Sequence, residues 1–445
     1  MENLALMPKY EAYKDSQVQW IGDIPVNWNL EKAKWLFYKA DRKPLVDDDI
    51  VTCFRDGQVT LRKNRRTEGF TNALKEHGYQ RICKGDLVIH AMDAFAGAIG
   101  VSDSDGKSTP VYAACVPRKK GEVNSYYYAY YMRDLALSGF IVSLAKGIRE
   151  RSTDFRFNDF AELLLPFPDY EEQTRIANFL DQKTAQIDEA IAIKEQQISL
   201  LKERKQIIIQ QAVTQGLDPN VPMKDSGVDW IGKIPAHWEC TAVKRLLDIP
   251  ITDGPHTTPQ LHDEGIPFIS AEAIKGGEIN FDKKRGYINE KDYLLFSNKY
   301  TPKVNDIYMV KSGATTGRVA IVRTETKFTI WSPLAVFRVD KNKLNPLYLY
   351  YFLQSYSFLK GVELSWSFGT QQNIGMGVLG NLFALAPPLE EQQFIVSSIE
   401  PHFREIDIAS EQVYQQIEKL KEYKTTLINS AVTGKIKITP EMVEQ

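Results

Sequence analysis

The chain lacks several features that would point to a familiar class of protein. It has only four cysteines, Cys53, Cys83, Cys115 and Cys240, whose spacing fits neither a disulfide framework nor a zinc site. No apolar run approaches the about 18 residues of a membrane span, and the first residues lack a signal-peptide pattern. The six histidines show no metal-ligand spacing. We therefore expect free thiols, no bound metal and a cytoplasmic protein.

Catalytic motifs are also scarce. The stretch from Gly100 to Ser108 resembles a phosphate loop but has five residues between its glycines instead of four. Asn345-Pro346-Leu347 lacks the second proline and the aromatic residue of an adenine-methylase site. His256 has no Ser or Cys partner at a spacing typical of nucleophilic catalysis. The sequence therefore predicts a binding protein rather than an enzyme.

What the chain does have is an internal repeat. Residues 14–28 read KDSQVQWIGDIPVNW and residues 224–238 read KDSGVDWIGKIPAHW, with ten of fifteen positions identical at an offset of 210. Two tryptophans, a glycine and a proline keep their register, which chance does not explain. A period this long far exceeds that of solenoid repeats and indicates two modules of ordinary domain size.

A second pair of matching segments closes each half of the chain. Residues 171–214 match residues 390–433 without a gap at an offset of 219. Between the matched ends, about 140 residues in each half share only scattered likeness. Each module thus consists of a motif, a divergent globular region and a long closing segment. This plan suggests one mechanical role performed twice and two different things recognised.

The closing segments are predicted to be long helices. The first contains no Pro or Gly, and only Pro401 interrupts the second. Asp169 and Glu172 resemble a capping box, and Gly216 and Gly434 stand where helices end. Apolar residues recur at spacings that alternate between three and four, as in a coiled coil, with Thr184, Lys194, Lys205 and Lys424 as exceptions. In the first segment the positions are Leu180, Ile187, Ile191, Ile198, Leu201, Ile208 and Ala212, and in the second Ile399, Ile406, Ser410, Val413 or its neighbours, Ile417, Leu420, Leu427 and Ala431.

The two helices are expected to pair in antiparallel fashion, because their apolar positions match in length and phase. A parallel pair would require the chain to return about 65 Å, the length of roughly 43 helical residues, before the second module. An antiparallel pair needs only a short connection and relates the modules by a pseudo-two-fold axis. The alternative is two separate amphipathic helices, each packed on its own module.

The net charge of −2 hides an uneven distribution. Residues 29–165 carry 22 basic and 18 acidic side chains, and residues 239–385 carry 17 and 14, whereas the rest of the chain carries 16 and 25. Residues 50–85 alone hold eight basic and three acidic groups. Basic domains on an acidic connector indicate contact with phosphates, although any one cluster could be a solvated surface loop.

Both globular regions are predicted to be α/β (α+β) domains of the same plan. Asn124 and Asn345 begin helices with aromatic residues at i, i+3 and i+4. Such residues could stack on bases, but this spacing is more typical of a core. Short apolar runs predict three strands in each region: 86–90, 98–101 and 111–116, and 306–310, 319–322 and 334–337.

Taken together, these motifs resemble those of the specificity subunit of type I restriction-modification systems. The resemblance is carried by the paired Trp-Ile-Gly-x-Ile-Pro-x-x-Trp motifs, the paired Glu-Glu-Gln helix starts that follow a proline, and the stretch Asp-Gly-Pro-His-Thr-Thr-Pro at residues 253–259. It covers essentially the whole chain. It implies two target-recognition domains, each reading one half of a bipartite, asymmetric DNA sequence, and an antiparallel two-helix coiled coil that sets the unread spacer.

The resemblance also implies partners. Two methyltransferase subunits would dock on the pseudo-symmetric chain, and restriction subunits would join to give an ATP-dependent nuclease. S-adenosylmethionine, ATP and magnesium would belong to those subunits, and the specificity subunit would be non-catalytic without a cofactor of its own. The implied plan is a motif segment (1–28), target-recognition domain 1 (29–165), a central helix (166–215), a linker with the repeated motif (216–238), target-recognition domain 2 (239–388), a C-terminal helix (389–434) and a tail (435–445).

Candidate DNA-binding residues follow from base chemistry. Arg or Lys can contact guanine and Asn or Gln adenine, whereas most phosphate contacts carry no sequence information. The candidates in the first domain are Arg55, Arg62, Lys63, Arg65, Arg66, Arg149 and Arg151. Those in the second are His256, Thr257, Lys283, Lys284, Arg285, Lys311, Arg318, Gln371, Gln372 and Asn373.

Two other interpretations stay open on the sequence alone. A stand-alone structural or regulatory DNA-binding protein would have the same basic domains but no methyltransferase partner, and tight specific binding by the isolated chain would favour it. An enzyme with an unrecognised site, such as a nuclease, would be favoured by metal-dependent cleavage of DNA by the pure chain.

Overall fold

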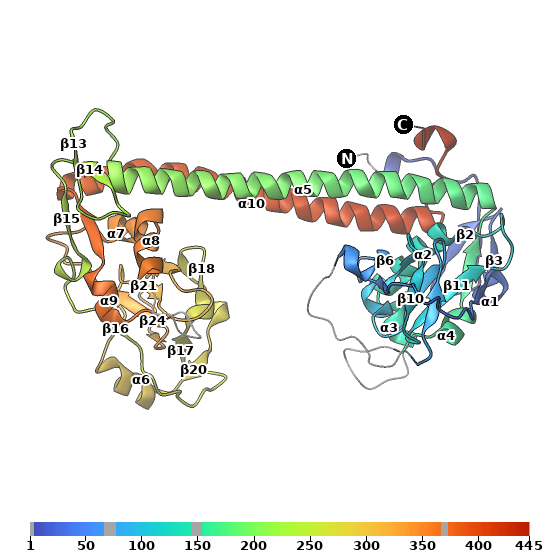
Figure 1. Cartoon of the computed structure of the whole chain (residues 1–445), viewed down its shortest axis with the longest axis horizontal. Helices are drawn as coiled ribbons and strands as arrows, with labels where there is room; N and C mark the ends of the chain where they lie inside the picture. The colour runs from blue at the N-terminus through green and yellow to red at the C-terminus, as the bar shows by residue number, and fades with distance from the viewer. Residues whose placement is uncertain (1–3, 66–76, 145–153, 366–372, 445) are drawn as a thin grey trace. The chain divides into compact units, whose positions relative to one another are not determined.

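The chain forms two compact units (Figure 1). Unit 1 comprises Met1–Lys194 and Tyr414–Gln445, and unit 2 comprises Glu195–Val413. Each unit therefore contains one globular region, the beginning of one long helix and the end of the other. The computed structural model describes residues 4–65, 77–144, 154–365 and 373–444.

The two predicted long helices are present as α5 (Tyr170–Gln215) and α10 (Leu389–Val432), and the second continues through Pro401. At the start of α5, Asp169 accepts a hydrogen bond from the backbone N–H of Glu172 at 2.7 Å, as the capping pattern predicts. The carboxylate of Glu172 binds two aromatic residues of the N-terminal motif instead of the helix start. The second half of the expected capping box is therefore wrong.

Within each unit, the segments of α5 and α10 pack antiparallel (Figure 1). In unit 1 Lys424 binds both carboxylate oxygens of Asp188 at 2.7 Å, and in unit 2 Lys205 binds both oxygens of Asp407 at 2.8 Å. The offset of 219 converts one pair into the other. The predicted apolar positions of both helices are buried or half-buried, so the expected antiparallel coiled coil is confirmed.

Unit 1 is built on a four-stranded antiparallel sheet in the order β4-β11-β8-β9. These strands are β4 (Phe37–Lys39), β8 (Leu87–His90), β9 (Ile99–Val101) and β11 (Tyr112–Pro117). Two-stranded pairs surround it: β1 (Tyr13–Asp15) with β2 (Asp23–Pro25), β3 (Asn29–Lys32) with β12 (Leu164–Phe167), β5 (Val51–Cys53) with β6 (Val59–Leu61), and β7 (Gln80–Ile82) with β10 (Gly106–Ser108). The shorter helices are α1 (Ala33–Leu36), α2 (Ser125–Leu137), α3 (Phe140–Leu144) and α4 (Phe157–Ala161).

Unit 2 has a sheet of the same form in the order β16-β24-β21-β22. These strands are β16 (Thr252–Asp253), β21 (Ile307–Val310), β22 (Val319–Ile321) and β24 (Leu334–Phe337). The other strands are β13 (Met223–Asp225) with β14 (Lys233–Pro235), β15 (Glu239–Ala242) with β25 (Phe383–Ala386), β17 (Ile266–Ile269) with β20 (Gly286–Ile288) and β23 (Thr329–Ile330), and β18 (Ile274–Lys275) with β19 (Glu278–Ile279). The shorter helices are α6 (Glu290–Ser297), α7 (Pro346–Phe352), α8 (Tyr356–Leu364) and α9 (Met376–Asn381).

The predicted strands and helix starts of both globular regions are present. Asn124 caps α2 and Asn345 caps α7, each through its side-chain oxygen. Tyr127 and Tyr348, which begin the aromatic runs of these helices, are fully buried, so the expectation of a core role is confirmed. Because the central sheets are antiparallel and helices pack beside them, the fold is the α+β form of the predicted class.

All four cysteines are free thiols, as expected. Within the described residues, no helix is both long enough and apolar enough to cross a membrane.

Candidate nucleic-acid interface

The two repeated segments at the ends of each module meet through a buried tryptophan. In unit 1 the indole N–H of Trp28 donates to Glu172 at 2.9 Å, and the hydroxyl of Tyr10 donates to the same carboxylate at 2.7 Å. In unit 2 the indole N–H of Trp238 donates to Glu391 at 3.0 Å. The Trp-Ile-Gly motif thus anchors the first turn of the long helix, which explains why both segments repeat.

The glutamine after each of these glutamates also has matching partners. Gln173 accepts a hydrogen bond from the backbone N–H of Asn124 at 2.8 Å, and Gln392 accepts one from Asn345 at 2.7 Å. The amide N–H of each glutamine donates to a proline carbonyl just before its own helix. The start of each long helix is thereby fixed to the start of the aromatic helix of the same module.

Each aromatic helix also binds the end of the long helix that the other module contributes. The hydroxyl of Tyr127 donates to the carbonyl of Val432 at 2.9 Å, and that of Tyr348 donates to the carbonyl of Val213 at 3.1 Å. We call the Trp–Glu, Gln–Asn and Tyr–Val hydrogen bonds the frame contacts. They join residues that match between the modules, so the two units share a scaffold on which other surfaces can differ.

The candidate interface lies where β8 ends in unit 1 and β21 ends in unit 2, a region we call the sheet end. The residues that follow these strands, Ala91 and Lys311, accept backbone hydrogen bonds from Phe155 and Ile374. The chain positions shortly before these two donors hold several predicted candidates. Those that lie outside the described residues are Arg149, Arg151, Gln371 and Gln372, together with Arg66 of the earlier basic stretch.

In unit 1 Asp93 pairs with one arginine at the sheet end and lies beside a histidine. Arg55 donates to the carboxylate of Asp93 at 2.7 Å, and Nδ1 of His90 accepts a hydrogen bond from the backbone N–H of Asp93 at 3.1 Å. Burial lowers the pKa of the His90 imidazole against the opposing effect of Asp93. His90 is the strand residue that the sequence predicts, and it also belongs to this cluster. Because the Arg55 side chain is 66% exposed, its guanidinium can exchange the carboxylate for an incoming phosphate.

The basic stretch after β6 has fewer unpaired positive side chains than its composition implies. Lys63 pairs with Asp49 at 2.5 Å, and Arg65 pairs with Asp56 at 2.6 Å. Arg62 donates to a threonine hydroxyl at 3.4 Å. Aspartates within the same domain thus partly neutralise the described part of the stretch, and the positive field there is weaker than a residue count suggests.

In unit 2 a buried carboxylate organises the sheet end. Lys299 donates to Oδ1 of Asp253, a side chain with no exposed surface. Nζ of Lys311 and Nε2 of His256 lie 3.3 and 3.2 Å from Oδ2 of Asp253, but neither approach has the angles of a hydrogen bond. The structure therefore brings together two predicted candidates, His256 and Lys311, and adds Lys299.

A stacked arginine lies beside this cluster. The guanidinium carbon of Arg285 is 3.8 Å from the centre of the Trp331 ring. A guanidinium nitrogen of Arg285 lies 3.9 Å from the carboxylate of Glu272. Gly254 packs so closely on β23 that a Cβ there would lie 2.0 Å from the carbonyl oxygen of Ile330. The turn that carries Asp253 is thereby held next to Trp331, so Arg285 belongs to the same surface.

Backbone pairing places two more candidates at the sheet end of unit 2. Val310 donates its N–H to the carbonyl of Arg318 at 2.8 Å, and Asn373 forms a β-bridge with Ser312. The side chains of Arg318 and Asn373 are exposed. Three other candidates make no contact with the sheet end within the described part of the chain. They are Thr257, Lys283 and Lys284.

Sequence reasoning missed Asp93, Lys299 and Trp331. Asp253 belongs to the motif at 253–259 and could have been recognised as a counter-charge for His256. Lys299 lies 46 residues further along the chain, and no local pattern connects it to that motif.

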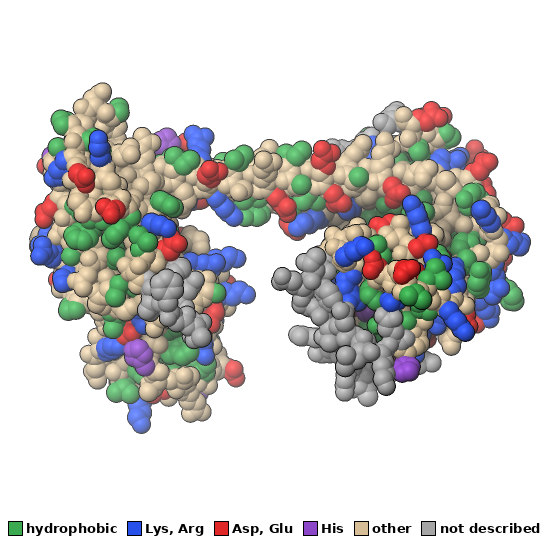
Figure 2. Space-filling model, viewed as in Figure 1, with side chains coloured by type: hydrophobic (Ala, Val, Ile, Leu, Met, Phe, Trp, Pro, Cys, Tyr) green, Lys and Arg blue, Asp and Glu red, His purple; other side chains and the backbone are tan. Residues whose placement is uncertain are grey.

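On the face shown in Figure 2, Lys and Arg side chains are interspersed with Asp and Glu in both units. This distribution agrees with the ion pairs at the sheet ends. Among the described residues, no group of three or more His, Cys, Asp or Glu side chains is placed to hold a metal ion.

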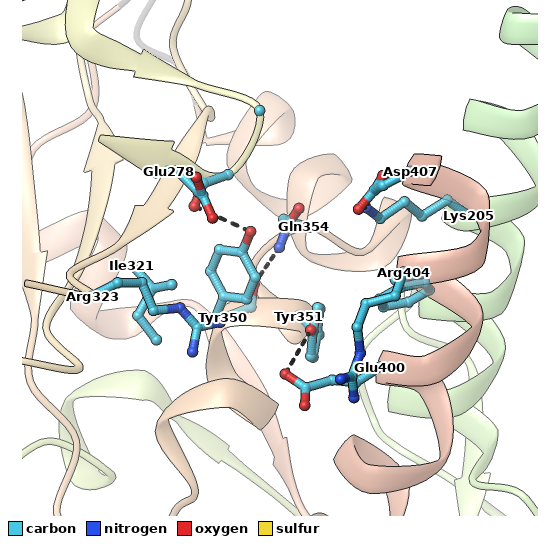
Figure 3. A pocket seen from close by; sticks show the side chains of 13 residues that line it. Lys205, Glu278, Ile321, Arg323, Tyr350, Tyr351, Gln354, Glu400, Arg404 and Asp407 are labelled. Carbon is cyan, nitrogen blue, oxygen red and sulfur yellow. Dashed lines mark hydrogen bonds and ion pairs between the residues drawn. The ribbon is translucent and has the colours of Figure 1, made fainter. Parts of the chain in front are cut away.

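A cavity of about 380 Å³ lies in unit 2 between the aromatic helix α7 and the long helix α10 (Figure 3). The hydroxyl of Tyr351 donates to Glu400 at 3.4 Å across it, and in unit 1 Tyr130 donates to Asp181 at 2.7 Å at the matching position. Because acidic and basic residues balance, the cavity does not favour a polyanion, and we assign it to the junction of globular region and helix. Its charged residues are Lys205, Arg323, Arg404, Glu278, Glu400 and Asp407.

Comparison with known proteins identifies relatives of the whole chain. Residues 237–419 match the family model of the type I restriction modification DNA specificity domain. A Methanocaldococcus jannaschii protein assigned as the MjaX specificity subunit of a type I restriction enzyme is 26% identical over 97% of this chain and 98% of its own length. The EcoBI specificity subunit of Escherichia coli is 27% identical over 62% of this chain and 59% of its own length.

The fold also has a solved counterpart. A chain from a structural study of complex assembly and conformational transition of the type I R-M system superposes with a TM-score of 0.67 at 16% identity, over 92% of this chain and 98% of that one. This structural likeness shows a shared fold. The family match and the relatives show similarity in sequence. Residues 237–419 thus match a type I restriction modification DNA specificity domain, and the chain as a whole is similar in sequence to type I restriction enzyme specificity subunits.

Proposed function

We propose that this chain is the DNA sequence-recognition subunit of a type I restriction-modification complex, a non-catalytic subunit in which each globular region reads one half of a bipartite, asymmetric site. The observation that carries the proposal is the contrast within the repeat. The frame contacts are the same in both units, whereas the sheet ends carry different basic residues. Two like scaffolds with unlike surfaces are suited to reading two different half-sites.

The helix pair sets the unread spacer between the half-sites. Each unit clamps the start of one long helix and the end of the other through frame contacts, so a globular region cannot slide along the helices without breaking buried hydrogen bonds. The spacer is therefore determined by helix length and not by the globular regions.

Two methyltransferase subunits and the restriction subunits dock on this chain, and S-adenosylmethionine, ATP and magnesium bind to those partners in the cytoplasm. The repeated frame supports two equivalent docking positions, because a partner that recognises one module's conserved segments meets the same residues in the other.

The proposal is tested by mapping adenine methylation across the genome in cells that carry this chain with its methyltransferase. Cells that lack only this chain serve as the control. We expect a split, asymmetric motif that disappears with the chain. An active methyltransferase with no chain-dependent motif would instead favour a stand-alone DNA-binding protein.

The same map assigns the half-sites to units. Replacing the globular region of unit 2 with that of another family member should change one half of the motif and leave the other half and the spacer unchanged. A change in both halves would contradict independent reading by the two units.

A further inference from the structure

In the cluster at the sheet end of unit 2, the basic side chains reach the solvent to different extents, whereas the carboxylate is buried. The side chain of Asp253 is fully buried, whereas those of His256, Lys299 and Lys311 are 69%, 44% and 11% exposed. Two ammonium groups and one carboxylate leave an excess of at least one positive charge. Because the carboxylate is shielded from solvent, an anion that approaches from outside meets the cations first.

Donors remain available in this cluster. Of the three ammonium hydrogens of Lys299, one is directed to Asp253 and another to the carbonyl of Gly254 at 3.2 Å. Because Oδ2 of Asp253 accepts no hydrogen bond from the described residues, neither Lys311 nor His256 has its N–H directed at that oxygen. The three side chains are thus held together by charge while N–H groups stay free to bind another acceptor.

The backbone keeps this arrangement compact. Since a Cβ at Gly254 would collide with the carbonyl of Ile330, only glycine allows the turn after β16 to approach β23 this closely. The turn brings His256 back over Asp253, three residues earlier. Ammonium groups are point charges without the planar fork that distinguishes bases, so they suit a tetrahedral anion better than a base edge.

We propose that Lys299, Lys311 and His256 form a binding site for one backbone phosphate of DNA, with Asp253 as the buried positioning group. The inference rests on the proposed function and deepens it, since it assigns this surface to sequence-independent contact. The stacked Arg285 beside it is then the group placed to meet a base.

The test uses the full chain in complex with its methyltransferase and fluorescently labelled duplexes. One duplex carries the motif from the methylation map and the other a scrambled sequence. Binding is measured by anisotropy at several NaCl concentrations for the wild type, Lys299→Met, His256→Ala and Lys299→Arg. Lys343→Met is the matched control, because it removes an exposed, paired lysine that follows the opposite end of β24.

We expect Lys299→Met and His256→Ala to weaken binding to both duplexes by about tenfold, because a charge-assisted hydrogen bond contributes roughly that much. For Lys299→Met the slope of log affinity against log salt should fall by about 1. Lys299→Arg should retain most of the affinity, and Lys343→Met should leave both quantities unchanged.

Two results would overturn the inference while leaving the proposed function intact. Unchanged affinity and salt slope in Lys299→Met and His256→Ala, with the wild type preferring the mapped duplex, would make the cluster a structural ion network only. Loss confined to the mapped duplex would make it a base reader. A wild-type complex that does not prefer the mapped duplex contradicts the proposed function itself, and one that binds neither duplex contradicts both. Melting temperatures of all variants identify any loss that comes from misfolding.

Discussion

The sheet ends of the two units both pair an aspartate with basic side chains, but different residues supply them. In unit 1 the half-exposed Asp93, which follows β8, pairs with Arg55, and its backbone N–H donates to the imidazole of His90. In unit 2 the fully buried Asp253 of the edge strand β16 holds His256 and two lysines. The frame contacts, by contrast, coincide position by position. The repeat therefore preserves the residues that build the scaffold, whereas each recognition surface is assembled separately.

Removing a buried ion pair should give the largest difference in stability between the two units. Asp306 accepts two hydrogen bonds from Arg338 at 2.7 Å and one from Tyr300, and the hydrogen bonds between Arg338 and Asp306 raise the pKa of the guanidinium. Asp86, at the position that matches Asp306, pairs with an arginine from a different strand end, because Arg42 follows β4 whereas Arg338 follows β24. Asp306→Ala should destabilise unit 2 by about 3–5 kcal/mol, because it leaves a buried charge without its partner. Asp86→Ala should cost roughly 1–3 kcal/mol, since the side chain of Arg42 is 30% exposed and can reach water.

Hydrogen exchange of amides in β21 and β8 measures each loss within its own unit. Equal losses, or a larger loss in unit 1, would contradict the role assigned to burial.

The Trp–Glu frame contact should contribute more to the stability of unit 1 than to that of unit 2. Glu172 is buried and binds Tyr10 and Trp28, whereas Glu391 is half-buried and binds Trp238 and a histidine on the surface. Glu172→Leu should cost about 2–4 kcal/mol, because two buried donors lose their acceptor, and Glu391→Leu about 1–2 kcal/mol.

Urea unfolding followed by tryptophan fluorescence provides the measurement. Glu171→Leu is the control, since it replaces the exposed glutamate next to Glu172. If the control is as unstable as Glu172→Leu, the hydrogen bonds to the aromatic residues are not the cause.

The stacked arginines should separate the two half-sites. Arg65 lies 4.3 Å from the ring of Phe54 in unit 1, and Arg285 lies 3.8 Å from the ring of Trp331 in unit 2. Each aromatic ring thus lies against a guanidinium, the group that can contact guanine through two hydrogen bonds. Arg65→Ala should weaken binding roughly 10–100-fold through the first half-site only, and Arg285→Ala through the second only.

Duplexes in which one half-site is scrambled distinguish these outcomes, and the corresponding Arg→Lys variants show whether charge alone suffices. Unchanged affinity at two salt concentrations would remove that arginine from the interface.

The smallest expected effects are those of the helix-pair ion bridges. Lys205→Ala and Lys424→Ala should each cost less than about 1 kcal/mol, because both pairs are largely exposed. The coupling energies within the two pairs should be equal, since the offset of 219 converts one bridge into the other, whereas Lys205→Ala also removes a contact with the Phe403 ring. Double-mutant cycles with Asp407→Ala and Asp188→Ala measure each coupling, and unequal couplings would contradict the equivalence of the two helix segments.

The sequence alone was sufficient to predict the repeat, the long helices, their antiparallel pairing and three of the four strands in each central sheet. These features depend on local periodicity, on capping residues such as Asn124 and on matched positions along the chain, all of which can be read without coordinates. The same reasoning found basic stretches but could not tell that Lys63 and Arg65 are neutralised by aspartates.

Only the tertiary structure decided which residues meet. Trp28 and Glu172 are 144 residues apart, and Asp253 and Lys299 are 46 apart, so no local pattern could pair them. The sign and strength of a charged surface depend on burial and on partners brought together by folding. The scaffold of this protein could therefore be predicted from the sequence. Its candidate DNA-binding surface could not, because long-range contacts determine which charged side chains are available to bind DNA.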